Sequence, residues 1–447
     1  MPTAIDLLIE PGWIIPIEPA GTVLENHALA VDQGRIVALL PIADAAGLYA
    51  PREHVRLPGH VLLPGFVNLH THAAMALLRG YADDLPLMRW LNERIWPAER
   101  QYVSPDFIRD GTLLAAWEML RGGVTCFNDM YFFPGAAAEA ARAAGIRAVL
   151  GAVVIEFPTV YATDANDYLE KGLAVRDAWR DEPLISFTLA PHAPYTVSDR
   201  TFEQVATLAA QLDVVIHLHL HETKAEIDES LRQHGVRPVE RLHRLGLLGP
   251  NLIAVHAVHL TPREIDQLAG DGCAVAHCPT SNMKLASGIA PVVELLAAGI
   301  RVGLGTDSAA SNNRLDIMRE MRQAALLAKV ASGDATAVPS HQALRMATLD
   351  GAAALGLDGV IGSLIPGKSA DLCAIRLDDW SSQPCYDPAS HVVHVAGREQ
   401  VSHVWVAGRL RIRDGRPVDM SPSHLIDISN SWHNRRRLRD LDYPQAP

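Results

Sequence analysis

Cysteine is scarce in this chain and follows no pairing pattern. The 447 residues contain five cysteines, which are scattered and show no C-x-x-C spacing. This argues against a disulfide framework and against a zinc site built from thiolates. The sequence also lacks an N-terminal signal segment and any apolar run of about 18 residues, the length that a membrane helix needs. We therefore expect a cytoplasmic protein with no membrane partner.

An excess of positive charge is also missing. Lysine and arginine number 39 against 51 aspartates and glutamates, so the formal net charge is -12. A negative field repels polyanions, which argues against nucleic acid as a partner. The expected partner is a small neutral or cationic molecule, and association into a homo-oligomer is left open.

Two short segments match patterns without the context that those patterns need. Residues Gly362–Ser369 satisfy the phosphate-loop expression, but a predicted strand follows where a helix is required, so we interpret them as a turn. The basic run Arg435–Arg439 lies in an acidic protein and is interpreted as part of a solvated helix. Neither segment is assigned a function.

Alternating apolar and amphipathic stretches predict the fold. From residue 61 to 364, short apolar runs alternate with helical patterns such as Asp106–Arg121 and Asp164–Trp179, which is typical of a (β/α)8 TIM-like barrel. Short strand-like runs before residue 61 and after residue 364, among them His391–Val395, predict a small composite β-sandwich domain formed by residues 1–60 and 365–447. The predicted barrel strands are Leu62–Leu69, Thr125–Asn128, Arg147–Val154, Leu184–Ala190, Val214–Leu220, Leu252–His256, Cys273–His277 and Arg301–Gly305.

The first predicted barrel strand ends in two histidines one residue apart. Residues i and i+2 of a strand point to the same side, so His70 and His72 are able to present two imidazoles to one metal ion. Alone this pattern is weak, because buried histidines that bond to main-chain oxygens are common. The later strands decide its interpretation.

Further histidines and carboxylates follow the later strands. Val214–Glu222 carries histidines at alternate positions, of which His219 lies near the strand end and is followed by Glu222. His256 ends the sixth predicted strand and Asp307 follows the eighth. In a barrel of this kind, active sites lie at the carboxyl ends of the strands. Each residue separately has a structural explanation, such as a helix cap for Asp307, but their joint placement indicates a metal site.

The quoted motifs resemble a known family. Pro64–His72, His219–Glu222, His256 and Gly305–Asn313 resemble the amidohydrolase superfamily over nearly the whole chain. The segments His70–Gly80, Trp90–Glu99, Pro191–Tyr195 and His277–Asn282 are similar to its methylthioadenosine/S-adenosylhomocysteine deaminase branch. The resemblance implies a mononuclear site.

Specific roles follow from this resemblance. It implies that His70, His72, His219 and Asp307 bind the metal. It also implies that His256 and Glu222 are catalytic neighbours, that Glu99 accepts hydrogen bonds from ribose hydroxyls, and that His192 contacts the nucleoside.

The composition of the fourth predicted strand favours one metal ion. Two-metal relatives need a carboxylated lysine there, and residues 184–195 contain no lysine. Three imidazoles and a carboxylate suit Zn²⁺ with one position left for water, although iron and manganese remain alternatives. We therefore expect one divalent ion per chain.

The expected reaction is hydrolytic deamination of an adenine nucleoside. Water adds to C6 of the purine, ammonia leaves and the inosine analogue is released. Glu222 would protonate N1, Asp307 would accept the water proton while contacting the substrate, and His256 would hydrogen-bond the attacking oxygen. The product and the metal make this a zinc-dependent aminohydrolase acting on the C–N bond of a cyclic amidine.

The expected substrate is 5'-methylthioadenosine. Near its end, from Leu150 through Glu156, the third predicted strand offers no arginine for the carboxylate of S-adenosylhomocysteine, and Met75, Leu78, Trp90 and Trp96 are candidates to contact a thiomethyl group. S-adenosylhomocysteine and adenosine remain open, as does a related enzyme acting on guanine, a pterin or a triazine. An inert barrel is disfavoured because every expected ligand type is present.

Overall fold

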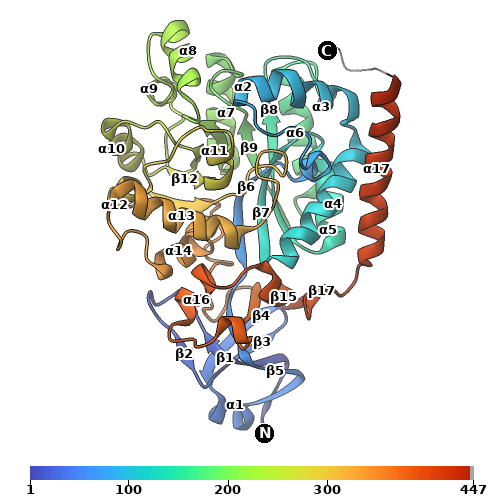
Figure 1. Cartoon of the computed structure of the whole chain (residues 1–447), viewed down its shortest axis with the longest axis vertical. Helices are drawn as coiled ribbons and strands as arrows, with labels where there is room; N and C mark the ends of the chain where they lie inside the picture. The colour runs from blue at the N-terminus through green and yellow to red at the C-terminus, as the bar shows by residue number, and fades with distance from the viewer. Residues whose placement is uncertain (443–447) are drawn as a thin grey trace.

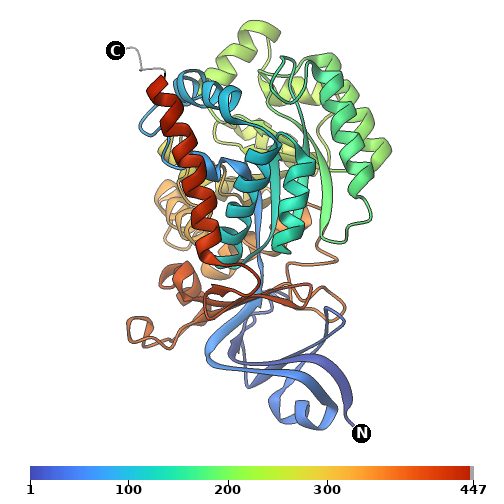
Figure 2. The same ribbon diagram turned by 90° about the vertical axis from the view of Figure 1, so that its right-hand side faces the viewer.

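The protein has two parts, a strand-and-helix barrel and a sheet formed by both ends of the chain. The computed structural model describes residues 1–442, with side chains described through residue 435. In Figure 1 the barrel lies above the terminal sheet, and the N-terminus lies at the far end of that sheet. Figure 2 shows the same division after a quarter turn.

The barrel consists of eight parallel strands that follow one another in sequence order around the sheet. The closing edge between the last and first strands is held by the main-chain N–H of Asp307, which donates to the oxygen of His70 at 3.0 Å. The side chain of Asn68 also bonds to Thr306 across this edge. The predicted barrel is therefore confirmed. Its strands are β6 (Phe66–Thr71), β7 (Val124–Tyr131), β8 (Arg147–Val154), β9 (Ile185–Pro191), β10 (Ile216–Leu220), β11 (Leu252–His256), β12 (Ala274–His277) and β13 (Arg301–Leu304).

The predicted first strand is two strands. Residues 62–64 end β5 (Tyr49–Pro64), which pairs with β14 (Leu372–Arg376) in the terminal sheet, and β6 begins only at Phe66. Gly65 makes the transition, since a Cβ there would lie 2.1 Å from the hydroxyl oxygen of Thr125. The apolar run continues through this point because the end of β5, residues 61–64, is buried as all of β6 is.

Side-chain alternation along β6 turns its histidine inward. Val67 and Leu69 pack outward in a cluster with Ala352 of α15 (Leu349–Ala354). Asn68 and His70 lie on the opposite side of the strand, which faces the barrel interior. The two-residue period of the strand thus determines which residues reach the site.

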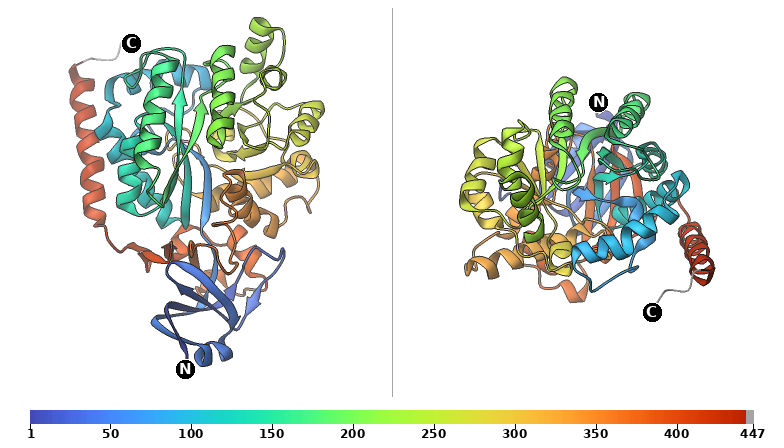
Figure 3. Two further views of the ribbon diagram at one scale, coloured as in Figure 1. Left: turned by 180° about the vertical axis from the view of Figure 1, so that it is seen from behind. Right: turned by 90° about the horizontal axis from the view of Figure 1, so that it is seen from above.

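Helices cover the outside of the barrel, as Figure 3 shows from above. Predicted helices agree with the structure to within about one residue at most ends, as expected where caps are clear: Ser104 and Asp164 accept main-chain N–H groups at two helix starts. The helices are α4 (Pro105–Arg121), α5 (Pro134–Ala144), α6 (Ala165–Trp179), α7 (Asp199–Leu212), α8 (Lys224–His234), α9 (Pro238–Arg244), α10 (Pro262–Gly270), α11 (Pro279–Lys284), α12 (Val292–Ala297), α13 (Ile317–Ser332), α14 (Ser340–Met346) and α15.

A separate helical segment follows β6 and precedes α4. It comprises a 3-10 helix (Ala73–Leu78), α2 (Leu87–Trp90), a π-helical turn (Leu91–Ile95) and α3 (Trp96–Tyr102). In Figure 1, α2 and α3 lie above the barrel strands, at the end opposite the terminal sheet. This segment therefore brings Trp96 and Glu99 toward the carboxyl ends of the strands.

Strands from both termini form one mixed nine-stranded sheet. The order is β17-β16-β15-β14-β5-β1-β3-β4, with β2 paired to β1. β1 and β5 are parallel, and the other pairs are antiparallel. The composite arrangement predicted from the two ends is present, while the exact domain boundaries stay a prediction. The remaining strands are β1 (Thr3–Ile14), β2 (Leu24–Glu25), β3 (His27–Asp32), β4 (Arg35–Pro41), β15 (Val401–Val406), β16 (Arg409–Arg413) and β17 (Arg416–Pro417); a short helix, α1 (Ile42–Leu48), joins β4 to β5.

A strand predicted at His391–Val395 is wrong. These residues belong to α16 (Pro388–His394). Asp387 caps the helix by accepting the N–H of Ala389, and Pro388 occupies its first position. The β-branched valines favour a strand locally, but the cap and proline favour a helix.

A buried ion pair joins the two parts of the molecule. Arg147, at the start of β8, contacts both carboxylate oxygens of Asp371, with its Nε 3.2 Å from Oδ2. Asp371 lies just before β14, and its other oxygen also accepts the hydroxyl of Ser369 at 2.7 Å. Both charged side chains are at least nine-tenths buried. This ion pair therefore links the barrel base to the terminal sheet.

The last described helix, α17 (Pro422–Asp442), runs along the outside of the barrel (Figures 1 and 3). Trp432 donates from its indole nitrogen to Asp110 at 2.8 Å and packs edge-on against Phe107. The basic run that we interpreted as helical starts in this helix at Arg435, and its remaining side chains lie outside the described residues. Within residues 1–442, no helix is long and apolar enough to cross a membrane.

The segment that matches the phosphate-loop pattern forms a turn. Lys368 donates to the hydroxyl of Ser363 at 2.7 Å and lies 3.4 Å from the carboxylate of Glu18. Strand β14 follows this segment. Lys368 is therefore paired within the protein, which agrees with our interpretation of this segment as a turn.

Candidate active site

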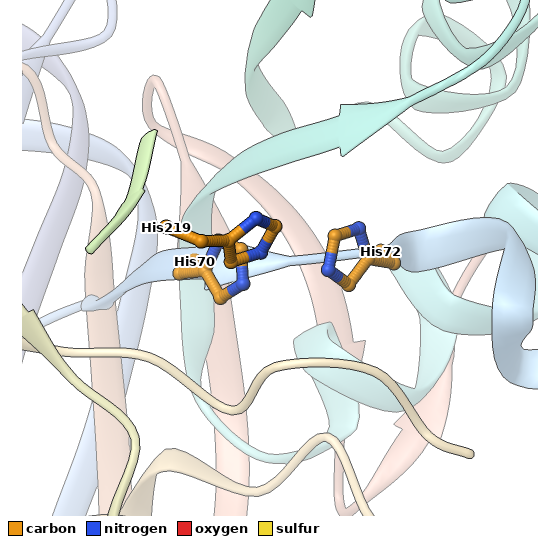
Figure 4. Close-up of side chains that lie close together, drawn as sticks. All are labelled: His70, His72 and His219. Carbon is orange, nitrogen blue, oxygen red and sulfur yellow. The ribbon is translucent and has the colours of Figure 1, made fainter. Parts of the chain in front are cut away.

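The structure brings the predicted metal ligands together at the carboxyl ends of the barrel strands. His70 and His72 come from the end of β6, His219 from β10, and Asp307 follows β13. The candidate ligand atoms of the three histidines lie within 4.8 Å of one another, and Figure 4 shows the rings side by side. This is the rim on which barrels of this kind carry their active sites.

Main-chain oxygens orient two of the histidines. The Nδ1 of His72 lies 2.6 Å from the oxygen of Met130, and the Nδ1 of His219 lies 2.8 Å from the oxygen of His192. A carbonyl oxygen only accepts, so each Nδ1 carries the proton and each Nε2 keeps its lone pair. That tautomer is the one a metal ligand needs.

His70 is supported by another histidine. Its Nδ1 lies 2.9 Å from the Nε2 of His217, which lies two residues before His219 on β10. Its Nε2 is fully buried without a hydrogen-bond partner and lies 3.4 Å from Asp307. An unpaired buried nitrogen is costly unless a ligand satisfies it, so the donor set fits a metal ion.

The carboxylate of Asp307 is held in a defined orientation. Its Oδ2 accepts hydroxyls from Ser281 at 2.6 Å and Ser311 at 2.7 Å, and its Oδ1 lies 3.3 Å from the Nε2 of His72. Burial alone would raise the pKa of Asp307, but contacts from His70 and His72 outweigh it and lower this pKa well below its usual range. Asp307 therefore presents one charged oxygen to the histidine cluster.

Glu222 and His256 lie beside each other at the edge of this cluster. The Oε2 of Glu222 is 3.7 Å from the Nε2 of His256, whose Nδ1 is 2.8 Å from the side-chain oxygen of Asn282. Burial raises the pKa of Glu222, and the neighbouring His256 only partly opposes this effect. A buried carboxyl group with a raised pKa is suited to carrying a proton.

The backbone at two of these positions is left-handed. His256 has φ +72° and Asp307 has φ +59°, values that residues other than glycine seldom adopt. Strain of this kind persists where surrounding contacts over-determine the conformation, which is common at functional sites. Here it directs both side chains across the barrel rim.

A cavity of about 380 Å³ opens next to the cluster. Its polar lining combines His72, His219 and Asp307 with every other predicted site residue, namely Glu99, His192, Glu222 and His256. Its apolar lining includes Met75, Trp90 and Trp96 from the predicted thiomethyl contacts, whereas Leu78 does not line it. The predicted site residues thus face one continuous space, apart from His70 beneath it.

Glu99 and His192 both line the cavity. Burial raises the pKa of Glu99 to about 7, although the hydroxyl of Tyr131 donates to its Oε1 at 2.7 Å and opposes the rise. Burial lowers the pKa of His192 to about 3, so this ring is neutral at physiological pH, with its Nδ1 3.1 Å from Thr196. Both side chains are therefore positioned for hydrogen bonds to a neutral, polar molecule.

Three residues near the site were not predicted from the sequence: Glu226, Tyr131 and Arg100. Glu226 accepts the main-chain N–H groups of His221 and Glu222, each at 2.9 Å. Its spacing after the helix cap Thr223 is a recognisable capping signal that would have identified it. Tyr131 was missed because its partner Glu99 lies 32 residues away.

The third missed residue is Arg100. It lines the cavity from α3, whereas the prediction about an arginine concerned only the end of the third barrel strand. At the end of that strand, Glu156 bonds instead to Ser198 and Thr201. Arg100 therefore borders the cavity from an element that strand order does not indicate.

The family of this chain follows from its sequence as well as from this geometry. Residues 61–411 match the model described as the amidohydrolase family. The chain belongs to this family. The match covers all eight barrel strands from β6 to β13 and most of the C-terminal strands.

Named proteins and solved structures are similar to this amidohydrolase over nearly its whole length. It is 43% identical over 433 residues to a 5-methylthioadenosine/S-adenosylhomocysteine deaminase of Teredinibacter turnerae, covering 97% of this chain and 98% of that protein. It resembles the crystal structure of an adenosine deaminase from Xanthomonas campestris with bound zinc, with a TM-score of 0.97, 49% identity, and 98% and 100% of the two chains covered. An atrazine chlorohydrolase from Arthrobacter aurescens complexed with zinc is more distant, with a TM-score of 0.87, 26% identity, and 95% and 99% covered.

Proposed function

We propose that this amidohydrolase is a zinc-dependent deaminase of adenine nucleosides. Water replaces the amino group at C6 of the purine, which gives the inosine analogue and one ammonia. The observation that carries the proposal is the shared cavity, whose wall includes the histidine cluster, Glu222 and Glu99. The names of its relatives, one a methylthioadenosine deaminase and one a zinc-containing adenosine deaminase, support the same reaction.

The histidine cluster would hold one ion. His70, His72 and His219 would offer Nε2 atoms, and Asp307 would offer the oxygen that its two serine partners leave available. Zn²⁺ in such a site supplies Lewis acidity, which makes water a nucleophile near neutral pH. The other steps fall to side chains of the protein.

Glu222 is the proposed proton carrier. Because its pKa is raised by burial, its protonated form is available to protonate N1 of the purine as water adds to C6. The resulting carboxylate is then able to take the proton of the hydroxyl added at C6 and pass it to the departing amine. As the C6–N bond breaks, its electron pair leaves with ammonia, and the oxygen forms the C6=O bond.

His256 and Asp307 would orient the attacking water. Asn282 holds the Nδ1 of His256, so its Nε2 is directed toward the reacting oxygen. Asp307, fixed by Ser281 and Ser311, would accept the first proton of the same water and return it after ammonia has left, so that Glu222 regains its acid form. Both residues act on the nucleophile rather than on the leaving group.

We propose 5'-methylthioadenosine as the preferred nucleoside. Glu99 would accept the ribose hydroxyls, and His192, which lines the same cavity, would contact the nucleoside. Trp90, Trp96 and Phe157 line the same cavity and suit an apolar 5' substituent. Arg100 at the wall keeps S-adenosylhomocysteine, with its carboxylate, as a further substrate to test.

We place the protein in the cytoplasm, with a small-molecule substrate as its partner. The five cysteines lie apart as free thiols, four of them buried, which suits a reducing compartment. A homo-oligomer stays a prediction.

Ammonia release from a panel of compounds tests this function. The panel contains methylthioadenosine, S-adenosylhomocysteine, adenosine, adenine, guanine, a pterin and a chlorotriazine, with chloride release followed for the last. We expect the highest kcat/KM with methylthioadenosine and loss of activity after chelation, restored by zinc. Faster turnover of guanine, the pterin or the triazine would contradict the nucleoside assignment.

A further inference from the structure

The end of strand β7 contacts both the metal cluster and the substrate-binding wall. The main-chain oxygen of Met130 lies 2.6 Å from the Nδ1 of His72. The hydroxyl of the next residue, Tyr131, donates to the Oε1 of Glu99 at 2.7 Å. Two successive residues therefore set the position of a proposed metal ligand and of a proposed ribose-binding carboxylate.

Glu99 needs such support because of where it comes from. It lies on α3, a seven-residue helix in the segment above the barrel, and not on a barrel strand. A glutamate side chain has three rotatable torsions, whereas the ring of Tyr131 is buried and turns about only two. The hydroxyl of Tyr131 thus ties a flexible carboxylate to the rigid strand that also orients His72.

The contact leaves acceptor capacity for a substrate. A carboxylate offers about four lone-pair positions on its two oxygens, and Tyr131 uses one of them. Because Oε1 is held by Tyr131, the second oxygen of the same carboxylate, Oε2, also keeps a fixed direction. Two adjacent ribose hydroxyls require an acceptor carboxylate that is held in one orientation.

We infer that Tyr131 is a specificity-determining positioning residue, which holds Glu99 at the distance from the metal cluster where it engages a ribose diol. The inference rests on the proposed nucleoside deaminase function and deepens it. Tyr131 acts through Glu99 and takes no part in proton transfer. Its removal is therefore expected to impair the recognition of ribose more than the chemistry at C6.

Tyr161 provides a matched control for loss of a buried tyrosine hydroxyl. Its ring packs against Phe133 with centroids 4.9 Å apart, and its hydroxyl is buried without a hydrogen-bond partner. The Tyr161→Phe substitution removes the same atom without removing a contact to Glu99. Tyr131→Phe keeps the ring that lies edge-on to His72, with centroids 6.1 Å apart.

The first test compares ribose and 2'-deoxyribose substrates in the zinc-loaded enzyme. For Tyr131→Phe we expect kcat/KM for ribonucleosides to fall by about tenfold, the scale of one hydrogen bond to a charged group, chiefly through KM. For the 2'-deoxy analogue the fall in kcat/KM should be smaller, so that the ratio of kcat/KM between ribo and 2'-deoxy substrates decreases. Zinc content should be unchanged, and Tyr161→Phe should behave as the wild type.

A double-mutant cycle tests whether Tyr131 acts through Glu99. In the Glu99→Ala enzyme, adding Tyr131→Phe should change kcat/KM by less than about twofold, because the positioned group is already gone. Equal losses in both backgrounds, or an equal loss for ribo and deoxy substrates, would overturn the inference.

The outcomes separate this inference from the proposed function. If the wild type deaminates ribonucleosides preferentially while Tyr131→Phe leaves that preference intact, only the role of Tyr131 is wrong. If the wild type releases no ammonia from any nucleoside, the proposed function fails, and the inference fails with it.

Discussion

The Nδ1 of His219 lies 2.8 Å from the main-chain oxygen of His192. One residue of the cavity wall therefore orients a proposed metal ligand with its backbone while its own ring lines the substrate space. His72 is oriented in the same manner by Met130. Because these carbonyls determine the imidazole tautomers, the metal cluster and the cavity wall are parts of one hydrogen-bonded unit.

The first prediction concerns metal content. Purified protein should contain about one zinc ion per chain, and replacing His70, His72, His219 or Asp307 by alanine should remove both the ion and the activity, since each supplies one ligand atom. Metal analysis after gel filtration measures the stoichiometry. The exposed His234, at the end of α8, is a control whose replacement should change neither. A reproducible value of two ions per chain would contradict the single site.

The second prediction concerns Glu222. Glu222→Gln keeps the size of the side chain but removes the proton carrier, so kcat should fall by at least about 10² while zinc stays bound. Glu229→Gln, on the partly exposed side of α8, is the matched control and should be unaffected. Near-normal turnover of Glu222→Gln would leave Glu222 only a structural role before that helix.

The third prediction concerns ribose recognition by Glu99. Glu99→Ala should lower kcat/KM for methylthioadenosine by about tenfold or more, which corresponds to roughly 1.4 kcal/mol, because the ribose hydroxyls lose their acceptor. The difference in kcat/KM between ribo and 2'-deoxy substrates should become smaller. Glu93→Ala, on the exposed side of the preceding turn, serves as the control.

Two results together would contradict that assignment. They are equal turnover of adenine and of nucleosides by the wild type, and unchanged kinetics in Glu99→Ala. The metal-dependent deaminase would survive both results, since neither concerns the histidine cluster. Steady-state kinetics on ribo, deoxy and free-base substrates distinguish the cases.

The fourth prediction concerns the contact between the barrel and the terminal sheet. Arg147→Met leaves the carboxylate of Asp371 buried without its cation, which should cost about 3–5 kcal/mol of unfolding free energy. Denaturant titration of the zinc-loaded protein measures this change. Arg232→Ala, which breaks an exposed pair with Glu229, should have little effect. A loss equally small in Arg147→Met would show that the buried pair is dispensable.

Sequence patterns predicted the barrel well where signals were local. The bounds predicted for β8 and β11 agree with the structure, because apolar runs there end at clear punctuation. The start of β6 was misplaced because the buried end of β5 leads directly into it. Only the close approach of Gly65 to Thr125 separates the two strands. The strand predicted at His391–Val395 failed because helix-start signals at Asp387 and Pro388 outweigh the strand preference of valine.

What the sequence by itself determined is the set of residues at the rim of the barrel. Strand alternation put His70 and His72 on one side, and parallel strand order brought His219, His256 and Asp307 to the same end. These inferences need only local periodicity and the rule that parallel strands share an edge.

Only the tertiary structure decided how those residues are held. The contacts of His70 with His217, of Tyr131 with Glu99 and of Arg147 with Asp371 join elements that local patterns treat separately. The position of Arg100 at the cavity wall likewise depends on how α3 lies over the strands. Such contacts form only when the barrel closes and the helical segment packs on its rim, because side-chain geometry across elements depends on the whole packing and not on sequence spacing.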